Sequence, residues 1–438
     1  MLQRLHNTAE PTLYEVSAEE KSAICAAIDQ NELVDLALTL GNIPSRSGYE
    51  AEAAGYVYQW MEKEGFTPRS VAAVPHRPNI IGEYGGSGDG ASLLFTAHLD
   101  TESPDFSPAL DDHKYRPETV KKREWTECWL EDNRVHGFPV ANDRGPMTCF
   151  LMAAKALRKA GIELSGRLYL TACPGEIGPE PIEERAGIDF LGKDIGAHYL
   201  FHHGGVAPDY VVAAEGTDFG ITWVGSGYSL IRIRLLGEAA FTPALEHPSL
   251  LAHPNPIYRM GTVIEALHRW GVDYEQRYRY ESAGGIAIPK VQIDSVRAGV
   301  PHTFGAGTEV CNLYLEVGLA PHQNVAPVVR ELQTLLRSVK VGAFEVQPLV
   351  VRHGAEADAQ AVQPLQQAFA AATGQILNQP LQQAHPVYSS MWRDHNVFNT
   401  QGIPAVTCGM PRSLPRPEDM VNSAAIYALT ALAICGRA

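Results

Sequence analysis

The stretch SLLFTAHLD at residues 92–100 is an unbroken apolar run that ends in a histidine and an aspartate. A run without alternation predicts a central strand that is buried on both faces of a sheet. His98 and Asp100 would then lie at the carboxyl end of that strand, where open α/β sheets bind their ligands. In an extended chain the two side chains point the same way, and a carboxylate can fix the tautomer of a metal-binding imidazole. The pattern suggests a metal site, with a hydrogen-bonded buried histidine as the alternative.

The sequence around this strand predicts a sheet covered by helices. Apolar runs at 79–84 and 167–172 are separated by an amphipathic stretch at 146–160, an alternation that is typical of α/β domains. Nearer the N-terminus, Ser17 is followed three residues later by a glutamate, a capping box that predicts a helix over residues 17–40. The fold class is therefore expected to be α/β, with a mixed, mostly parallel sheet.

The middle of the chain follows a different pattern and predicts a second, smaller domain. The run SLIRIRLLG at 229–237 alternates apolar and basic residues, as a strand with one wet face does. Further strand-then-helix patterns predict a small α+β domain at 225–342, inserted into a larger domain made of 1–224 and 343–438. The strand-like FEVQPLVV at 344–351 is then expected to belong to the larger domain.

Composition limits the classes of partner that this protein could have. The chain has 438 residues, 50 of them acidic and 35 basic, and a formal charge of -15. We do not expect the protein to bind nucleic acid, because such binding depends on clustered lysine and arginine side chains. The seven cysteines form no CxxC pair, and no run reaches the roughly 18 apolar residues that would span a bilayer. We therefore expect a cytoplasmic protein that does not bind a membrane.

The chain also carries six short segments rich in acidic residues, glycine and proline. They are HLDT (98–101), DNRVHGFPVANDRGP (132–146), ACPGEIG (172–178), DYVVAAEGT (209–217), GEAAF (237–241) and SSMWRDHNVFNTQGIPAVTCG (389–409). In this order they resemble the motifs of the zinc-dependent aminoacylase, carboxypeptidase, peptidase T and succinyl-diaminopimelate desuccinylase family of metallopeptidases. The resemblance implies a zinc-peptidase-like α/β fold with an inserted lid domain that mediates homodimerisation.

The resemblance also implies roles for individual residues. His98 would be a metal ligand, and Asp100 would be its orienting partner in the catalytic site. Glu176 would bind a second metal and Glu215 the first. Asp394 would contribute to substrate binding.

Several positions depart from the family pattern. The aspartate that bridges two metals is matched by Asn142, with Asp143 one residue further on as another possible ligand. The glutamate that acts as general base is matched by Gly175. No histidine follows Gly409, where the family has a metal ligand, and the lid histidine that stabilises the oxyanion is matched by Phe241. A two-metal centre with its general base is therefore expected to be incomplete.

Two hypotheses about function follow from this mixture of matches and departures. The first is an amide hydrolase of altered or weak activity, in which one zinc ion is bound by His98, Glu215 and either Asp143 or Glu176. Its substrate would be a small peptide or an N-acyl amino acid. The second is a catalytically inactive relative, with or without a metal, that binds a small molecule or a protein partner.

Overall fold

The computed structural model describes residues 13–102, 122–183, 186–246, 248–300, 302 and 304–438. The chain forms two compact units, each with its own sheet and hydrophobic core. Unit 1 draws on Met1–Trp223, Ala357–Ala384 and Val397–Ala438, and unit 2 draws on Val224–Glu356 and His385–Asn396.

Unit 1 is built on a seven-stranded mixed sheet, which confirms the predicted fold class. Its strands are β1 (Arg69–Val74), β2 (Arg77–Gly85), β3 (Leu93–His98), β6 (Arg167–Cys173), β7 (Tyr210–Ala214), β8 (Ile221–Thr222) and β17 (Ala405–Cys408). They lie side by side in the order β1-β2-β6-β3-β7-β17-β8. The four central strands β6, β3, β7 and β17 are parallel, whereas β2 and β8 pair antiparallel with β6 and β17. All of β3 is buried, as its unbroken apolar run predicts.

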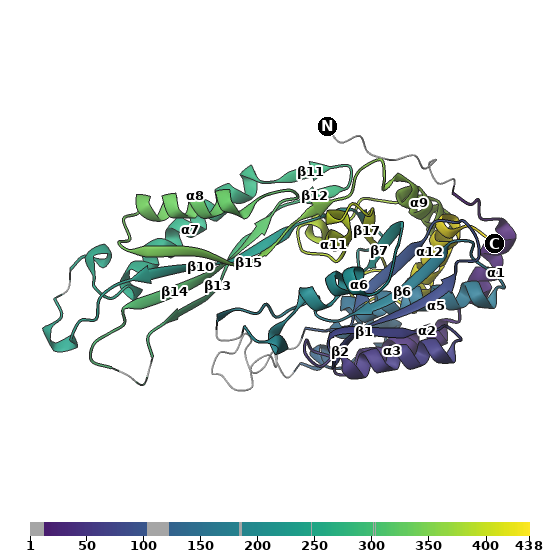
Figure 1. The fold of residues 1–438 in the computed structure, drawn as a ribbon, viewed down its shortest axis with the longest axis horizontal. Coiled ribbons are helices and arrows are strands. Elements are labelled where there is room, and N and C mark those ends of the chain that lie inside the picture. Colours follow the sequence, from purple (N-terminus) through teal and green to yellow (C-terminus); the bar gives the residue numbers. More distant parts are fainter. Residues whose placement is uncertain (1–12, 103–121, 184–185, 247, 301, 303) are drawn as a thin grey trace. The chain divides into compact units, whose positions relative to one another are not determined.

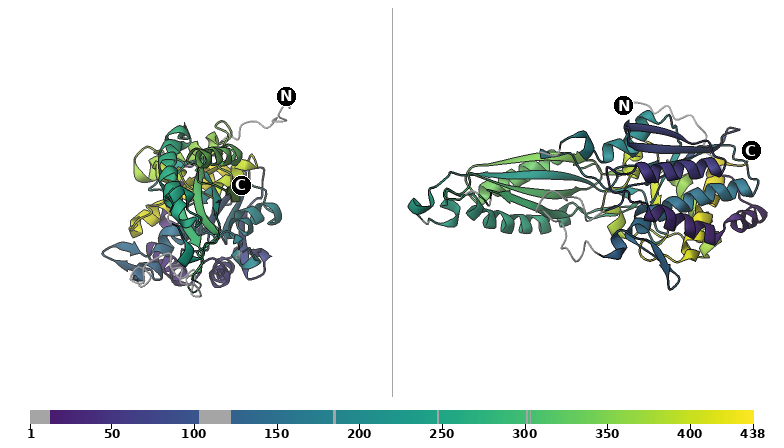
Figure 2. Two further views of the ribbon diagram at one scale, coloured as in Figure 1. Left: turned by 90° about the vertical axis from the view of Figure 1, so that its left-hand side faces the viewer. Right: turned by 90° about the horizontal axis from the view of Figure 1, so that it is seen from below.

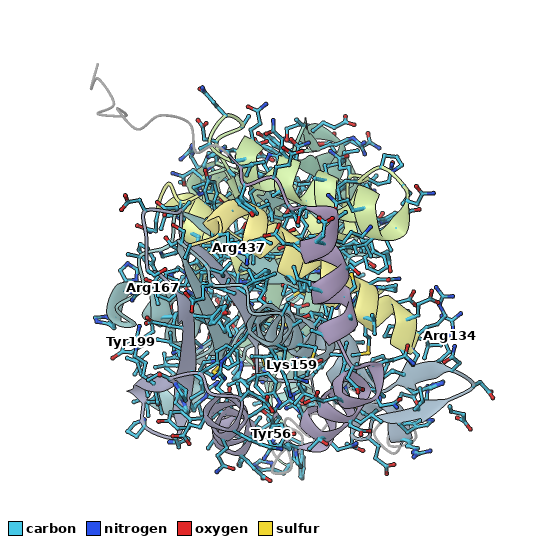
Figure 3. The ribbon with its side chains drawn as sticks, turned by 90° about the vertical axis from the view of Figure 1, so that its right-hand side faces the viewer. Tyr56, Arg134, Lys159, Arg167, Tyr199 and Arg437 are labelled. Atoms are coloured by element: carbon cyan, nitrogen blue, oxygen red, sulfur yellow. The ribbon has the colours of Figure 1, made fainter. Side chains whose placement is uncertain are left out.

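Helices cover the sheet of unit 1 and share its core (Figure 1). Those with residues in this core are α1 (Ala18–Ala27), α2 (Gln30–Asn42), α3 (Ala51–Lys63), α5 (Gly145–Lys159), α9 (Gln363–Leu377) and α12 (Pro417–Cys435). Two further helices are α6 (Ala197–His203), which contacts β1, and α11 (His395–Thr400), whose first two residues belong to unit 2. A small hairpin of β4 (Trp129–Glu131) and β5 (Arg134–His136) precedes α5. The C-terminal helix α12 packs on α5, α9 and α1, and Figure 3 shows it in yellow beside the purple α1.

The predicted single helix over 17–40 is wrong, because two helices occupy this region. The capping box of Ser17 and Glu20 is present at the start of α1. However, Ile28 is extended, and the Asp29 side chain accepts a hydrogen bond from the backbone N–H of Glu32 and so begins α2. An aspartate that can cap a new helix competes with continuation of the old one.

Unit 2 is a four-stranded antiparallel sheet with helices on one face (Figure 2). The strands lie in the order β13 (Val291–Ala298), β14 (Val310–Leu319), β10 (Gly227–Leu236) and β15 (Phe344–Arg352), and the main helices are α7 (Ile257–Arg277) and α8 (Val325–Ser338). Alternate residues of β10, such as Ile231 and Ile233, share one core with both helices. Shorter elements are β9 (Val224–Gly225), β11 (Tyr280–Ser282), β12 (Gly285–Ala287), β16 (Ala355–Glu356) and α10 (Pro386–Ser389).

Unit 2 extends beyond the residues proposed for the inserted domain. The strand β15, which the sequence pattern placed in the larger domain, pairs with β10 from Leu235 opposite Phe344 to Tyr228 opposite Arg352. Pairing between strands more than a hundred residues apart is not visible in either strand's own periodicity.

Within the described residues, no helix is both long and apolar enough to cross a bilayer.

Candidate functional site

The central parallel strands of unit 1 bring acidic and imidazole side chains to one edge of the sheet. His98 is the last residue of β3, Glu176 lies three residues beyond β6, and Glu215 directly follows β7. Because β6 and β7 both pair in parallel with β3, their carboxyl ends meet at this edge. His98 is 1% exposed and Glu215 is 2% exposed. The edge therefore holds buried groups that can bind a ligand or a metal.

The His98 ring is held by the backbone that follows it. Its Nδ1 donates a hydrogen bond of 2.7 Å to the carbonyl oxygen of Asp100, whereas the nearer carboxylate oxygen of Asp100 is 3.6 Å away. The carbonyl, and not the predicted carboxylate, thus makes the hydrogen bond to the imidazole. Since a carbonyl can only accept, Nδ1 carries a proton, and Nε2 is the ring nitrogen that is left to bind a metal. That Nε2 faces Asp143 Oδ2 at 3.4 Å and Glu176 Oε2 at 3.8 Å.

The Asp100 carboxylate connects the end of β3 to the loop that follows β6. It accepts hydrogen bonds from the backbone N–H groups of Glu176 (3.0 Å) and Ile177 (2.9 Å) and from the Ser47 hydroxyl (2.6 Å). Asp100 is fully buried, so these bonds compensate the loss of hydration of its charge. Asp100 therefore positions Glu176 beside His98 rather than orienting the imidazole through its own carboxylate.

Asp143 reaches the site from the turn before α5. This turn, Val140–Arg144, contains non-helical backbone at Asn142 and Asp143 and a cis peptide bond between them. Asp143 is 1% exposed. Among the hydrogen bonds of the described residues, none involves the buried Oδ1 of Asn142. Thus the position matched to the family's bridging aspartate offers an amide oxygen, and the neighbouring Asp143 supplies the carboxylate that faces His98.

The buried guanidinium group of Arg144 forms hydrogen bonds to the backbone near this turn. Arg144 is fully buried and donates to the carbonyl oxygens of Leu40, Ile43 and Leu99. Burial lowers the pKa of Arg144 to about 10, which leaves it protonated at neutral pH. Because Leu99 lies between His98 and Asp100, Arg144 helps to hold the end of β3 in place.

Gly175 has a backbone conformation that explains why no side chain is found there. Its φ is +78°, and a Cβ at this position would overlap the carbonyl oxygen of Gly192. The two glycines allow the loop around residue 192 to approach the loop after β6 closely. A glutamate at position 175, which the family resemblance would require, does not fit this arrangement.

Replacing Gly175 with alanine is expected to destabilise the protein. The positive φ alone costs about 1–3 kcal/mol for a residue with a side chain, and the overlap of the Cβ with the Gly192 carbonyl adds to this cost. Gly161→Ala is the matched control, because Gly161 also has a positive φ (+67°) but a Cβ there meets nothing within 4 Å. Chemical denaturation of both variants measures the difference. Equal losses of unfolding free energy would show that the Gly192 contact is unimportant.

A buried lysine lies next to Glu176. Lys193 begins a short 3-10 turn, Lys193–Ile195, and is 7% exposed. Its Nζ donates to the backbone oxygen of Glu176 and lies 3.2 Å from Glu176 Oε1. The two carboxylate oxygens of Glu176 therefore face different groups, one towards Lys193 and the other towards His98.

A buried ion pair supports the same loop. Arg77 donates through Nε and Nη2 to the two carboxylate oxygens of Glu50, at 2.8 and 2.5 Å, and both side chains are fully buried. A third donor of Arg77 bonds to the carbonyl of Leu191. Burial raises the pKa of Glu50, and the charge of Asp100 adds to that effect, while Arg77 opposes it. The pair links the start of α3 to the segment that carries Lys193.

Two other residues singled out in the sequence belong to unit 2. They are Asp394, which is 6% exposed, and Phe241, which is 66% exposed. Sequence reasoning missed Lys193 and Ser47, which hold Glu176 and Asp100. Neither lies within a motif, and the sequence carries no signal for them, since each contact joins residues well separated in the chain.

The donor chemistry of the site fits one cation. A buried imidazole nitrogen faces two carboxylates, and the distances of 3.4 and 3.8 Å between these donors are close to the spacing of two ligands of one zinc ion, each bound at about 2.0–2.2 Å. In the part of the chain that the structure describes, however, no three or more His, Cys, Asp or Glu side chains are already arranged to hold a metal. Asp143 and Glu176 already face His98, so binding would require a change in side-chain orientation that brings a third donor, such as Glu215, to the same ion.

Comparison with known proteins finds a curated relative with similarity over part of the chain and solved structures that share the fold. No family model matches the chain. A curated relative, the N-formyl-4-amino-5-aminomethyl-2-methylpyrimidine deformylase of Bacillus subtilis, is 28% identical over 156 residues, which are 34% of this chain and only a third (33%) of the relative.

Solved structures match over nearly the whole chain. A tripeptidase from Staphylococcus aureus aligns with a TM-score of 0.65 and 15% identity, over 93% of this chain and 99% of its own. Human carnosine dipeptidase 1 gives 0.65 and 13%, over 95% and 98%. A dinuclear metal-binding peptidase of the M20 family from Bacillus subtilis gives 0.58 and 15%, over 92% and 98%. The chain therefore shares the fold of the M20 family metallopeptidases, as the sequence resemblance predicts.

Proposed function

We propose that this protein is a metal-dependent hydrolase of small amides that uses one metal ion. The observation that carries the proposal is the buried Nε2 of His98, which faces the carboxylates of Asp143 and Glu176 at the carboxyl end of a parallel strand. This edge is where α/β folds bind their ligands, and the fold is shared with enzymes named as peptidases. Fold alone does not fix function, so the donor set is the decisive feature.

The proposed ligands are His98, Asp143 and Glu215, which offer one nitrogen and two carboxylate groups. All three are almost fully buried. His98 and Glu215 lie at the carboxyl ends of adjacent parallel strands, and Asp143 Oδ2 is 3.4 Å from His98 Nε2. A zinc ion bound there would polarise the amide carbonyl and make water a stronger nucleophile at neutral pH. The Nδ1 hydrogen bond to Asp100 orients the ring for this role.

Glu176 is the proposed proton acceptor, in place of the family's general base at the position of Gly175. Its Oε2 lies on the His98 side, while its backbone is anchored by Asp100 and its Oε1 by Lys193. Glu176 would take a proton from the water whose oxygen bonds to the amide carbon. It would then deliver that proton to the leaving nitrogen as the carbon–nitrogen bond breaks, which yields a carboxylic acid and an amine.

The proposed substrates are short peptides, N-acyl amino acids and N-formyl amines. The first class is suggested by the printed names of the tripeptidase and the dipeptidase, and the last by that of the deformylase. The homodimer and the cytoplasmic location implied earlier stay predictions. So does a role in substrate binding for Asp394.

The test combines metal analysis with a substrate screen. Protein purified without chelator is expected to contain about one zinc, manganese or cobalt ion per chain, and to hydrolyse at least one member of a panel of dipeptides, tripeptides, N-acetyl amino acids and N-formyl amines. Removal of the metal with a chelator should abolish turnover, and adding it back should restore it. A protein that binds no metal and turns over no amide would instead support the inactive, ligand-binding relative.

Replacing Asp100 with asparagine is expected to weaken metal binding by about 10–100-fold. An amide can no longer accept from both backbone N–H groups of the Glu176 loop without presenting a donor to one of its present partners. Asp209→Asn is the matched control. The Asp209 carboxylate also accepts a hydrogen bond from a backbone N–H, that of Ser92, but Ser92 directly precedes the first residue of β3, at the end of the strand away from His98. Competition titration with a metal-sensitive dye measures both variants. Unchanged affinity in the Asp100 variant would contradict its positioning role.

A further inference from the structure

A buried lysine side chain contacts the carboxylate of Glu176 at the candidate site. Lys193 is 7% exposed, and its Nζ contacts both the backbone oxygen and Oε1 of Glu176. Glu176 is the residue that the family resemblance assigns to the second metal. An ammonium group at this carboxylate supplies positive charge without any dissociable ion.

We propose that Lys193 takes the electrostatic place of a second metal, so that the centre binds one divalent ion instead of two. The inference rests on the proposed metal-dependent function and deepens it, because it states how many ions the site takes and which residue sets that number. Lys193 leaves Oε2 of Glu176 on the His98 side while it engages Oε1. A lysine bound in this way excludes a competing cation by charge repulsion.

The backbone around Lys193 makes its position a built-in feature of the fold. The carbonyl of Gly192 approaches Gly175 so closely that no side chain fits at Gly175. The same approach brings Lys193 within reach of Glu176, which is the next residue after Gly175. Loss of the family's base at position 175 and gain of the lysine are thus two consequences of one loop contact.

The remaining donors also suit one ion better than two. In two-metal hydrolases a carboxylate shared between the ions holds them about 3.5–4 Å apart. The position matched to that carboxylate is Asn142, whose neutral amide is a weaker bridge between two cations. Asp143, which faces His98, can still serve a single ion.

The experiment is a metal titration of the full-length, metal-free chain with Zn²⁺, followed by calorimetry and native mass spectrometry. The wild type is expected to bind one equivalent tightly. Lys193→Gln is expected to bind a second equivalent at least about tenfold more tightly than the wild type does, while Lys193→Arg, which keeps the charge, should stay at one. Lys159→Gln is the control for loss of positive charge, because Lys159 is 49% exposed on the surface of unit 1 (Figure 3).

The outcomes separate this inference from the proposed function. A wild type that binds two ions with similar affinity overturns the role of Lys193 and leaves a metal-dependent hydrolase standing. The same holds if Lys193→Gln folds, as judged by circular dichroism, and still binds only one ion. A wild type that binds no Zn²⁺ at all overturns both.

Discussion

The His98→Ala variant is expected to lose tight metal binding and, with it, more than about a thousandfold in kcat/KM on whichever amide the wild type hydrolyses. His98 supplies the only nitrogen in the proposed ligand set, and its Nε2 is the point at which the carboxylates of Asp143 and Glu176 meet. An alanine leaves these acidic groups without the imidazole between them. Elemental analysis and steady-state kinetics on the same preparation measure both losses.

Glu176→Gln is the matched variant for separating metal binding from proton transfer. It is expected to retain about one metal per chain and to lose about 10²–10⁴ in kcat, because an amide cannot accept the proton of the attacking water. Its backbone bond to Asp100 and its backbone contact with Lys193 are not altered by the substitution. If His98→Ala kept both metal and activity, or if Glu176→Gln were fully active, the proposed assignment of roles would be wrong.

Replacing Arg77 with methionine is expected to lower the free energy of unfolding by about 3–5 kcal/mol at neutral pH. Arg77 and Glu50 are both fully buried, so removal of the guanidinium leaves a carboxylate without its countercharge in the protein interior. The carbonyl of Leu191 loses its donor as well. Denaturation followed by circular dichroism gives the measurement. Arg167→Met serves as control, because Arg167 pairs with Glu83 at the surface (Figure 3), where an ion pair contributes at most about 1 kcal/mol.

The loss in the Arg77 variant should depend on pH in a defined direction. The pKa of Glu50 is already raised from its ordinary value of 4.5 by burial, and Arg77 is the group that opposes this rise. Without Arg77 the folded-state pKa rises further, so the carboxyl binds a proton more tightly in the folded than in the unfolded protein. The variant should therefore recover stability as the pH falls from 7 towards 4.5.

A double variant tests the same explanation without a change of pH. Arg77→Met combined with Glu50→Gln removes the buried charge and is expected to regain more than half of the loss. A double variant as unstable as Arg77→Met alone would show that packing around Arg77, and not the uncompensated charge of Glu50, is responsible.

The local sequence was sufficient to predict the main features of unit 1. The unbroken apolar run of β3 requires burial on both faces, which in turn places His98 at the end of a central parallel strand. The same reasoning predicted the helix before Ala160 and the capping box at Ser17. These properties are local, since strand and helix periodicities are carried by neighbouring residues.

Local sequence patterns could not predict the tertiary contacts around the candidate site or the assignment of every strand to its unit. The pattern of 344–351 is that of a strand, but only its pairing with β10 assigns it to unit 2. Asp100 was expected to orient His98 through its carboxylate, whereas the fold directs that carboxylate to the backbone after β6 and gives the histidine a carbonyl. Lys193 lies 17 residues from Glu176 and outside every recognisable motif.

The sequence by itself determined an α/β architecture and a histidine at the carboxyl end of a central strand, because burial on both faces follows from apolar patterning. The acidic residues near that histidine were indicated by the family resemblance. Only the tertiary structure decided that a lysine stands beside Glu176 and that no side chain fits at Gly175. Both depend on the close approach of the Gly192 carbonyl to Gly175, a contact between two loops whose positions are set by the packing of the whole unit.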